Sequence, residues 1–168
     1  AANVLRRLGE IDLNGRLVSR LYDSEKMNCH LFQMLANDEG DGIDPDDMQR
    51  MLRLGLAASS PLVQRFAALA AAKRSSVDVA FELTLLLNAA IKTTDRFLVH
   101  SVKLALREQG KQNADSFTRV RKLVEKQSIP AFAEICLAVK TPPAAEFILD
   151  NLDTLSEQNS SGLPSYLT

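Results

Sequence analysis

Apolar residues recur at steps of three and four along most of the chain, the period of one face of an α-helix. Several of these stretches begin after a Ser, Thr or Asp, often with Pro next, and these residue types favour helix starts. The predicted starts are Asp44-Pro45, Ser60-Pro61, Ser76-Val77, Thr94-Asp95, Ser128-Ile129-Pro130 and Thr141-Pro142. The first four lie 16, 16 and 18 residues apart, a spacing typical of a short helix and a tight turn, repeated.

From these starts the pattern predicts a run of short helices through the middle of the chain. Gly110 is expected to end one of them in the left-handed conformation, and Lys111–Ala114 is expected to form a linker after it. One helix carries no charged residue between Glu82 and Lys92, so we expect it to be the most buried. The expected ranges are Pro45–Ala57, Pro61–Lys73, Val77–Lys92, Asp95–Gln109 and Asp115–Gln127, followed by helices that start at Ser128 and Thr141.

The two ends of the chain have different patterns. Residues 1–36 predict a long amphipathic segment, either one helix bent at Asn14-Gly15 or two helices joined there. The apolar stripe of this segment could form a coiled-coil seam between two copies of the chain. Alternatively, the stripe packs against the segment's own domain. Residues 156–168 are rich in Ser, Gly, Pro and Asn and predict an extended tail.

Together these elements predict an all-α fold of about eight helices in one domain, residues 1–155. No stretch alternates apolar and polar residues as a strand would. A pair of helices recurs about every 33 residues, which favours stacked antiparallel helical hairpins, either solenoid-like or as an irregular bundle. The residue signatures of tetratricopeptide and ankyrin repeats are missing.

Composition narrows the class of protein. Hydrophobic residues make up 46% and charged residues 24%, as in an ordinary globular domain. No apolar run reaches the roughly 18 residues of a transmembrane helix, and the N-terminus lacks a signal-peptide pattern. The start Ala-Ala-Asn, without Met, suggests an excised part of a larger protein. Two cysteines, Cys29 and Cys136, are expected to be free thiols, so we predict an intracellular location, cytoplasmic or nuclear.

Catalytic and metal-binding patterns are weak. The acidic turn at residues 37–44 resembles a calcium loop only in part, because Met48 stands where the bidentate Glu should be. Cys29 and His30 point about 100° apart on a helix, so they do not form a nucleophile and its base. The chain has no phosphate loop, nucleophile elbow or zinc-ligand spacing. We therefore predict a protein that is not an enzyme and that holds no cofactor or metal.

A basic stretch in the middle of the chain is the main indication of a partner. Residues 71–126 carry 11 basic and 6 acidic side chains, a net charge of +5, although the whole chain has −1. The basic residues of two helices fall on one face of each, and they would merge if the helices formed an antiparallel hairpin around Lys111. The predicted partner-binding residues are Arg96, His100, Lys103, Arg107, Lys111, Arg119, Lys122 and Lys126.

These observations predict a protein–protein interaction or scaffold domain that binds an acidic or helical partner through the basic surface. Self-association as a homodimer through the N-terminal stripe is a second expectation. The alternative is a helical nucleic-acid-binding domain that contacts RNA or DNA backbones. No aromatic residue alternates with the basic ones, which argues against base stacking. An enzyme would need a deep pocket with a perturbed titratable group.

Overall fold

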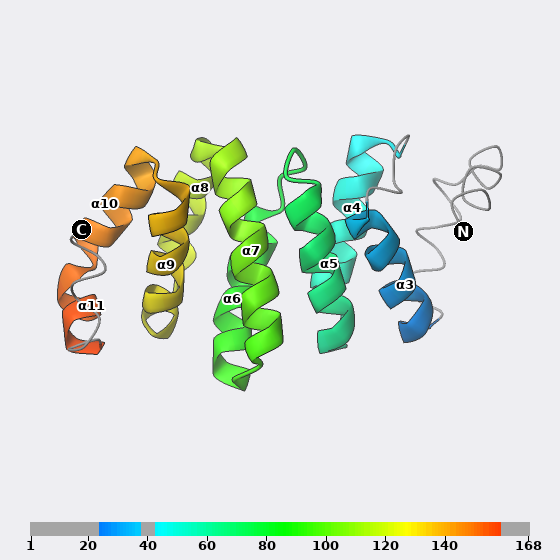
Figure 1. Ribbon diagram of the computed structural model, residues 1–168, viewed down its shortest axis with the longest axis horizontal. Helices are drawn as coiled ribbons and strands as arrows, with labels where there is room; N and C mark the ends of the chain where they lie inside the picture. Colours follow the sequence, from blue (N-terminus) through cyan, green and yellow to red (C-terminus); the bar gives the residue numbers. More distant parts are fainter. Residues whose placement is uncertain (1–23, 38–42, 159–168) are drawn as a thin grey trace.

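The computed structural model describes residues 24–37 and 43–158 (Figure 1). These residues form nine α-helices, two single-turn 3-10 helices and no strand, which confirms the all-α prediction. The helices are α3 (Glu25–Ala36), α4 (Pro45–Leu56), α5 (Pro61–Lys73), α6 (Ala80–Thr93), α7 (Arg96–Gln112), α8 (Ala114–Val120), α9 (Ile129–Val139), α10 (Pro142–Asp150) and α11 (Leu152–Gln158), with η1 (Arg121–Leu123) and η2 (Lys126–Ser128) between α8 and α9.

Consecutive helices alternate between two layers. Helices α3, α5, α7 and α9 stand side by side in one layer, with α4, α6 and α8 behind them (Figure 1). Helix α11 packs against α9, and α10 packs against α8 and α9. We call α3, α5, α7, α9 and α11 the odd layer and α4, α6, α8 and α10 the even layer. This arrangement confirms the prediction of stacked helical hairpins.

Small residues let the layers approach closely around α5. Ala67, Ala68, Ala70 and Ala71 are all fully buried, as expected for an Ala-rich helix that packs between α3 and α7. Gly55 of α4 meets the same region, and a Cβ built there would lie 2.7 Å from the Ala67 Cβ. The same added Cβ would also collide with the α3 side chain that faces Gly55. Helices α3, α4 and α5 can therefore approach this closely only because residue 55 has no side chain.

The strongest predicted starts are confirmed. The Asp44 side chain accepts a hydrogen bond from the Asp46 N–H at 2.9 Å, and Ser60 Oγ accepts one from the Val63 N–H. In both helices a Pro occupies the first turn. Helix α5 has the predicted bounds, and α4 ends one residue before the predicted Ala57. A cap followed at once by Pro therefore gave reliable starts here.

The prediction for the start of α6 is wrong. Ser76 does not cap it, because the helix begins at Ala80, three residues later than expected. The carboxylate of Asp78 accepts from the Ala80 N–H at 3.2 Å instead. Residues 74–79 thus form a longer connector between α5 and α6. The backbone of this connector is held by side chains from other helices.

The predicted bounds of α7 are also wrong at both ends. Thr94 has a left-handed backbone (φ 58°) and ends α6, while the Asp95 carboxylate caps α7. Gly110 is buried inside α7, where a Cβ would lie 2.8 Å from the Phe117 ring. It serves close packing of α8 on α7 rather than helix termination. Only Asn113 separates the two helices, so the expected linker does not exist.

The C-terminal third is divided more finely than the sequence suggests. The helix expected at Asp115–Gln127 is α8 followed by the two 3-10 turns, and the expected last helix breaks at Asn151 into α10 and α11. Helix α11 runs to Gln158, past the point where the tail was expected to begin. Of the predicted N-terminal segment, α3 packs on α5, whereas residues 1–23 lie outside the described part of the chain.

Two buried amide side chains hold the irregular connectors. Gln109 of α7 donates from Nε2 to the Val77 carbonyl at 2.9 Å and accepts the Val79 N–H at 3.3 Å. Asn88 of α6 donates to the Leu123 carbonyl at 2.9 Å and accepts the Glu125 N–H at 3.2 Å. Each amide therefore satisfies one backbone donor and one backbone acceptor that no helix pairs.

Candidate functional site

The candidate site is the outer surface of α5 and α7, neighbouring helices of the odd layer. These two helices together carry six Lys and Arg residues and a single carboxylate, Glu108, which leaves a net charge of +5. We call this surface the basic face. Its cations are Arg65, Lys73, Arg96, Lys103, Arg107 and Lys111, and the exposed His100 lies on the same helix as the last four.

Ion pairs reduce the positive charge of the basic face only in part. Glu108 accepts from Arg107 Nε and from Lys111 Nζ, both at 3.0 Å. Partial burial alone would raise the pKa of the Glu108 carboxyl, but the hydrogen bonds from Lys111 and Arg107 outweigh it and lower that pKa. Lys103 reaches across the layer to Glu134 of α9. Two carboxylates therefore form ion pairs with three of the cations of the basic face.

An apolar groove crosses the basic face. Its volume is about 470 Å³, and it runs between the end of α3, α5 and α7. The apolar wall is formed by Ala36, Leu69, Ala72 and Leu104, while Lys73 and Glu108 stand at the polar edge. Such a combination of apolar wall and charged edge is the usual form of a groove that takes one side of an amphipathic helix. The linear pattern did not reveal it, because the wall comes from three helices.

An exposed aromatic ring stands near the start of α7. Phe97 is 70% exposed, and the guanidinium of Arg65 lies 5.1 Å from the centroid of its ring. This contact joins α5 to α7 by a cation–π interaction. The expectation that no aromatic residue lies among the basic ones is therefore wrong at Phe97.

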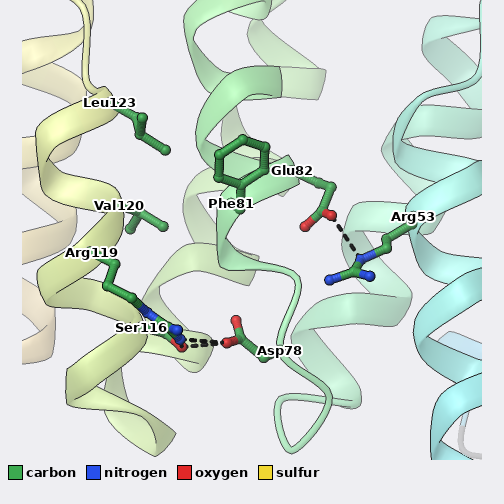
Figure 2. A pocket seen from close by; sticks show the side chains of 8 residues that line it. All are labelled: Arg53, Asp78, Phe81, Glu82, Ser116, Arg119, Val120 and Leu123. Carbon is green, nitrogen blue, oxygen red and sulfur yellow. Dashed lines mark hydrogen bonds and ion pairs between the residues drawn. The ribbon is translucent and has the colours of Figure 1, made fainter.

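The basic residues after α7 do not join the basic face, contrary to the merged ridge we expected. The chain turns at Asn113, and α8 lies in the even layer, where Phe117 packs against α7. Arg119 is directed into a hollow of that layer, 3.1 Å from Asp78 Oδ2 (Figure 2). Two helices that pack through their apolar sides present their polar sides in opposite directions, so the stripes stay apart.

Lys122 and Lys126 are exposed on the two 3-10 turns, η1 and η2, that lead to α9. Of the eight predicted partner-binding residues, the structure therefore gathers those on α7 and separates the other three. The residues that complete the basic face, Arg65 and Lys73, come from a helix that sequence reasoning had not connected with it. Periodicity within α5 could have found them.

The cysteines have the environment expected for free thiols. Cys136 of α9 is buried, and this burial raises the pKa of its thiol to about 12. Cys29 is half-buried; burial and the nearby Glu25 carboxylate raise the pKa of its thiol. His30 is exposed. In the part of the chain that the structure describes, no three His, Cys, Asp or Glu residues gather as metal ligands.

We expect a thiol reagent at pH 8 to modify one cysteine in the native protein, because a thiol with a pKa of about 12 has almost no thiolate at that pH. Cys29 should react, and Cys136 should react only after denaturant is added. The measurement is the number of thiols titrated before and after unfolding. Cys29→Ser should lose the native reaction, and two thiols reacting equally fast would contradict the burial of Cys136.

Within residues 24–37 and 43–158 no helix has the length and apolar character to cross a bilayer. Comparison of the chain with protein-family models, with curated proteins and with solved structures gave no match. The features that can indicate a function are therefore the basic face, its groove and the exposed Phe97.

Proposed function

We propose that this protein is a helical interaction module whose basic face binds an acidic amphipathic helix of a partner protein. The observation that carries the proposal is the apolar groove of about 470 Å³ on a surface with a net charge of +5. A partner helix would place its apolar side chains against Leu69 and Leu104 and its carboxylates near Lys73 and Lys111.

The charges and the groove have different roles in this proposal. Exposed Lys and Arg raise the association rate with an acidic partner and disfavour a basic one, and this effect weakens as salt is added. Burial of apolar side chains in the groove supplies affinity that salt does not screen. Binding should therefore need both an acidic side and an apolar side on the partner helix.

The test measures binding of a designed helical peptide with a Leu stripe and Glu elsewhere, by fluorescence anisotropy. Lys73→Glu with Lys111→Glu should weaken its binding about tenfold, since two edge attractions become repulsions. Both side chains are exposed, so the far-ultraviolet circular dichroism should stay unchanged.

The matched control is Lys122→Glu with Lys126→Glu, which changes the net charge equally but on the 3-10 turns. We expect this pair to weaken binding much less. Equal losses for both pairs would contradict a site on the basic face. A peptide with Lys in place of Glu should not bind the native protein.

A second candidate function is nucleic-acid binding, and the exposed Phe97 beside Arg65 is the observation that favours it. A ring of this kind can stack on a base while cations contact the backbone. A mixed-sequence 20-nucleotide RNA is the probe. Binding that falls steeply between low and high salt, and that Phe97→Ala weakens, supports this function; no binding at low salt rejects it.

Three further expectations belong to the proposal. The module is inferred to act by binding without catalysis and to work inside the cell, in the cytoplasm or nucleus. Its two free thiols are compatible with that compartment. Self-association through the N-terminal stripe stays a prediction, because most of that stripe precedes Ser24, where the described part of the chain begins.

A further inference from the structure

A second exposed apolar feature lies on the basic face, at the starts of α5 and α7. Phe97 is 70% exposed and Leu62 is 45% exposed. The Arg65 guanidinium lies 5.1 Å from the centroid of the Phe97 ring, and Leu62 is its neighbour one turn earlier on α5. These three side chains therefore lie at one level of the two helices, and we call them the aromatic patch.

The aromatic patch is in line with the apolar wall of the groove. Phe97 and Leu104 are seven residues apart on α7, and Leu62 and Leu69 have the same spacing on α5. Seven residues make two helical turns, so the members of each pair leave the same side of their helix about 10 Å apart. Leu69 and Leu104 both line the groove, and α5 and α7 stand side by side (Figure 1). The groove and the patch are therefore two apolar sites on one surface.

Positive charge accompanies both apolar sites. Lys73 stands at the edge of the groove, and Arg65 lies over the Phe97 ring. The carboxylate nearest to this ring along the chain is Asp95, and its Oδ1 already accepts the Phe97 and Leu98 N–H groups at 3.1 and 3.0 Å. An acidic helix that lies along α5 and α7 would therefore meet an apolar site and a cation at each of two levels.

We propose that the aromatic patch is a second anchor site for the acidic amphipathic helix that the groove binds. The partner helix would carry a large apolar or aromatic residue seven positions from the residue that fills the groove. This inference rests on the proposed function, because the groove holds the first anchor. Partner and α7 both advance about 1.5 Å per residue, so a spacing of seven on the partner matches the spacing of Phe97 and Leu104. Aromatic rings that pack together add affinity beyond the area they bury.

The experiment compares two designed acidic helical peptides of the same composition by fluorescence anisotropy. Both carry Leu as the groove anchor. One has Phe seven positions from this Leu, on the same side of the helix, and the other has Phe five positions from it, on a different side. The first peptide should bind about tenfold more tightly, because only its Phe can reach Phe97 while Leu fills the groove.

Equal affinities of the two peptides would overturn the second anchor site. If Lys73→Glu with Lys111→Glu still weakens both of them, the groove binds a helix and the proposed function stands without the aromatic patch. If neither peptide binds, the proposed function fails, and this inference fails with it.

Phe97→Ala should remove the tenfold difference between the two peptides. The matched control is Phe81→Ala, which removes the same side chain from the even layer and should leave the difference unchanged. Phe81 is 51% exposed and Leu85 is 47% exposed on the outer side of α6, the helix that we expected to be the most buried. Both Phe rings are at least half exposed, so both variants should keep the helicity of the native protein.

The same variant separates a protein partner from a nucleic acid. If Phe97→Ala weakens binding of the 20-nucleotide RNA but leaves the difference between the peptides, the ring serves nucleic-acid binding. That result would refute the second anchor site.

Discussion

Phe132→Ala should lower the free energy of unfolding by about 3 to 5 kcal/mol, the range for removing a large aromatic side chain from a closed core. Phe132 of α9 is fully buried. Its ring centroid lies 5.1 Å from that of Phe117 on α8 and 4.8 Å from that of Phe147 on α10. One side chain thus joins three helices from both layers. Urea denaturation followed by circular dichroism at 222 nm measures the change.

Phe97→Ala is the control, because it removes the same side chain from a site that is 70% exposed. It should cost less than about 1 kcal/mol, mainly the contact with Arg65. In a stack of hairpins each unit contacts only its neighbours, so the damage from Phe132→Ala should be local. Amide hydrogen exchange should speed up in α8–α10 more than in α3–α5. Equal destabilisation by the two substitutions would contradict the central place of Phe132.

The fold could be predicted wherever local signals agreed with each other. At Asp44 and Ser60 a capping side chain, a following Pro and an apolar stripe all indicated the same start, and the structure has helices there. Ser76 and Thr94 lacked the following Pro. Ser and Thr are also common in turns, so their presence alone could not separate a cap from a connector. Their helices begin elsewhere, at Ala80 and after Asp95.

The role of Gly110 could not be predicted from its neighbours in the sequence. Gly after a helical stripe usually ends the helix, because it adopts the left-handed backbone without strain. Here it stays helical, and its missing side chain makes room for Phe117. That reason lies in a helix beyond it in the chain. In the sequence, a glycine that ends a helix cannot be distinguished from one that makes room for a neighbouring helix.

The candidate sites could be predicted only within single helices. Spacing correctly placed Arg96, Lys103 and Arg107 along α7, but it could not tell which layer the following helix would join. For the same reason the apolar outer side of α6 looked like a fully buried helix. Whether Phe81 and Leu85 are covered depends on how far α4 and α8 extend over them. The spacing of apolar residues within α6 carries no information about that. The groove of the basic face is lined by residues from α3, α5 and α7, so no single helix in the sequence could indicate it.

The second large effect is expected at Gln109, which is 2% exposed. Gln109→Leu keeps nearly the same volume but removes the partners of the Val77 carbonyl and the Val79 N–H. Both backbone groups belong to the connector before α6; the Val79 N–H is buried and the Val77 carbonyl is partly buried, and both would lose their hydrogen bond. Each such loss costs about 1–3 kcal/mol, so we expect unfolding to become easier by about 3 kcal/mol. Sequence reasoning gave this residue no role beyond ending a helix.

Gln112→Leu makes the same replacement at an exposed position three residues later on α7, and it should change stability by less than about 0.5 kcal/mol. The two variants should be compared by urea denaturation with equal slopes, so that a shift of the midpoint reports stability. Gln109→Glu sharpens the test, because it keeps the shape but replaces the donor to Val77 by an acceptor. It should destabilise as Gln109→Leu does. If Gln109→Glu or Gln109→Leu had native stability, the connector would be held by its own backbone turns, and the long-range amide contact would be dispensable.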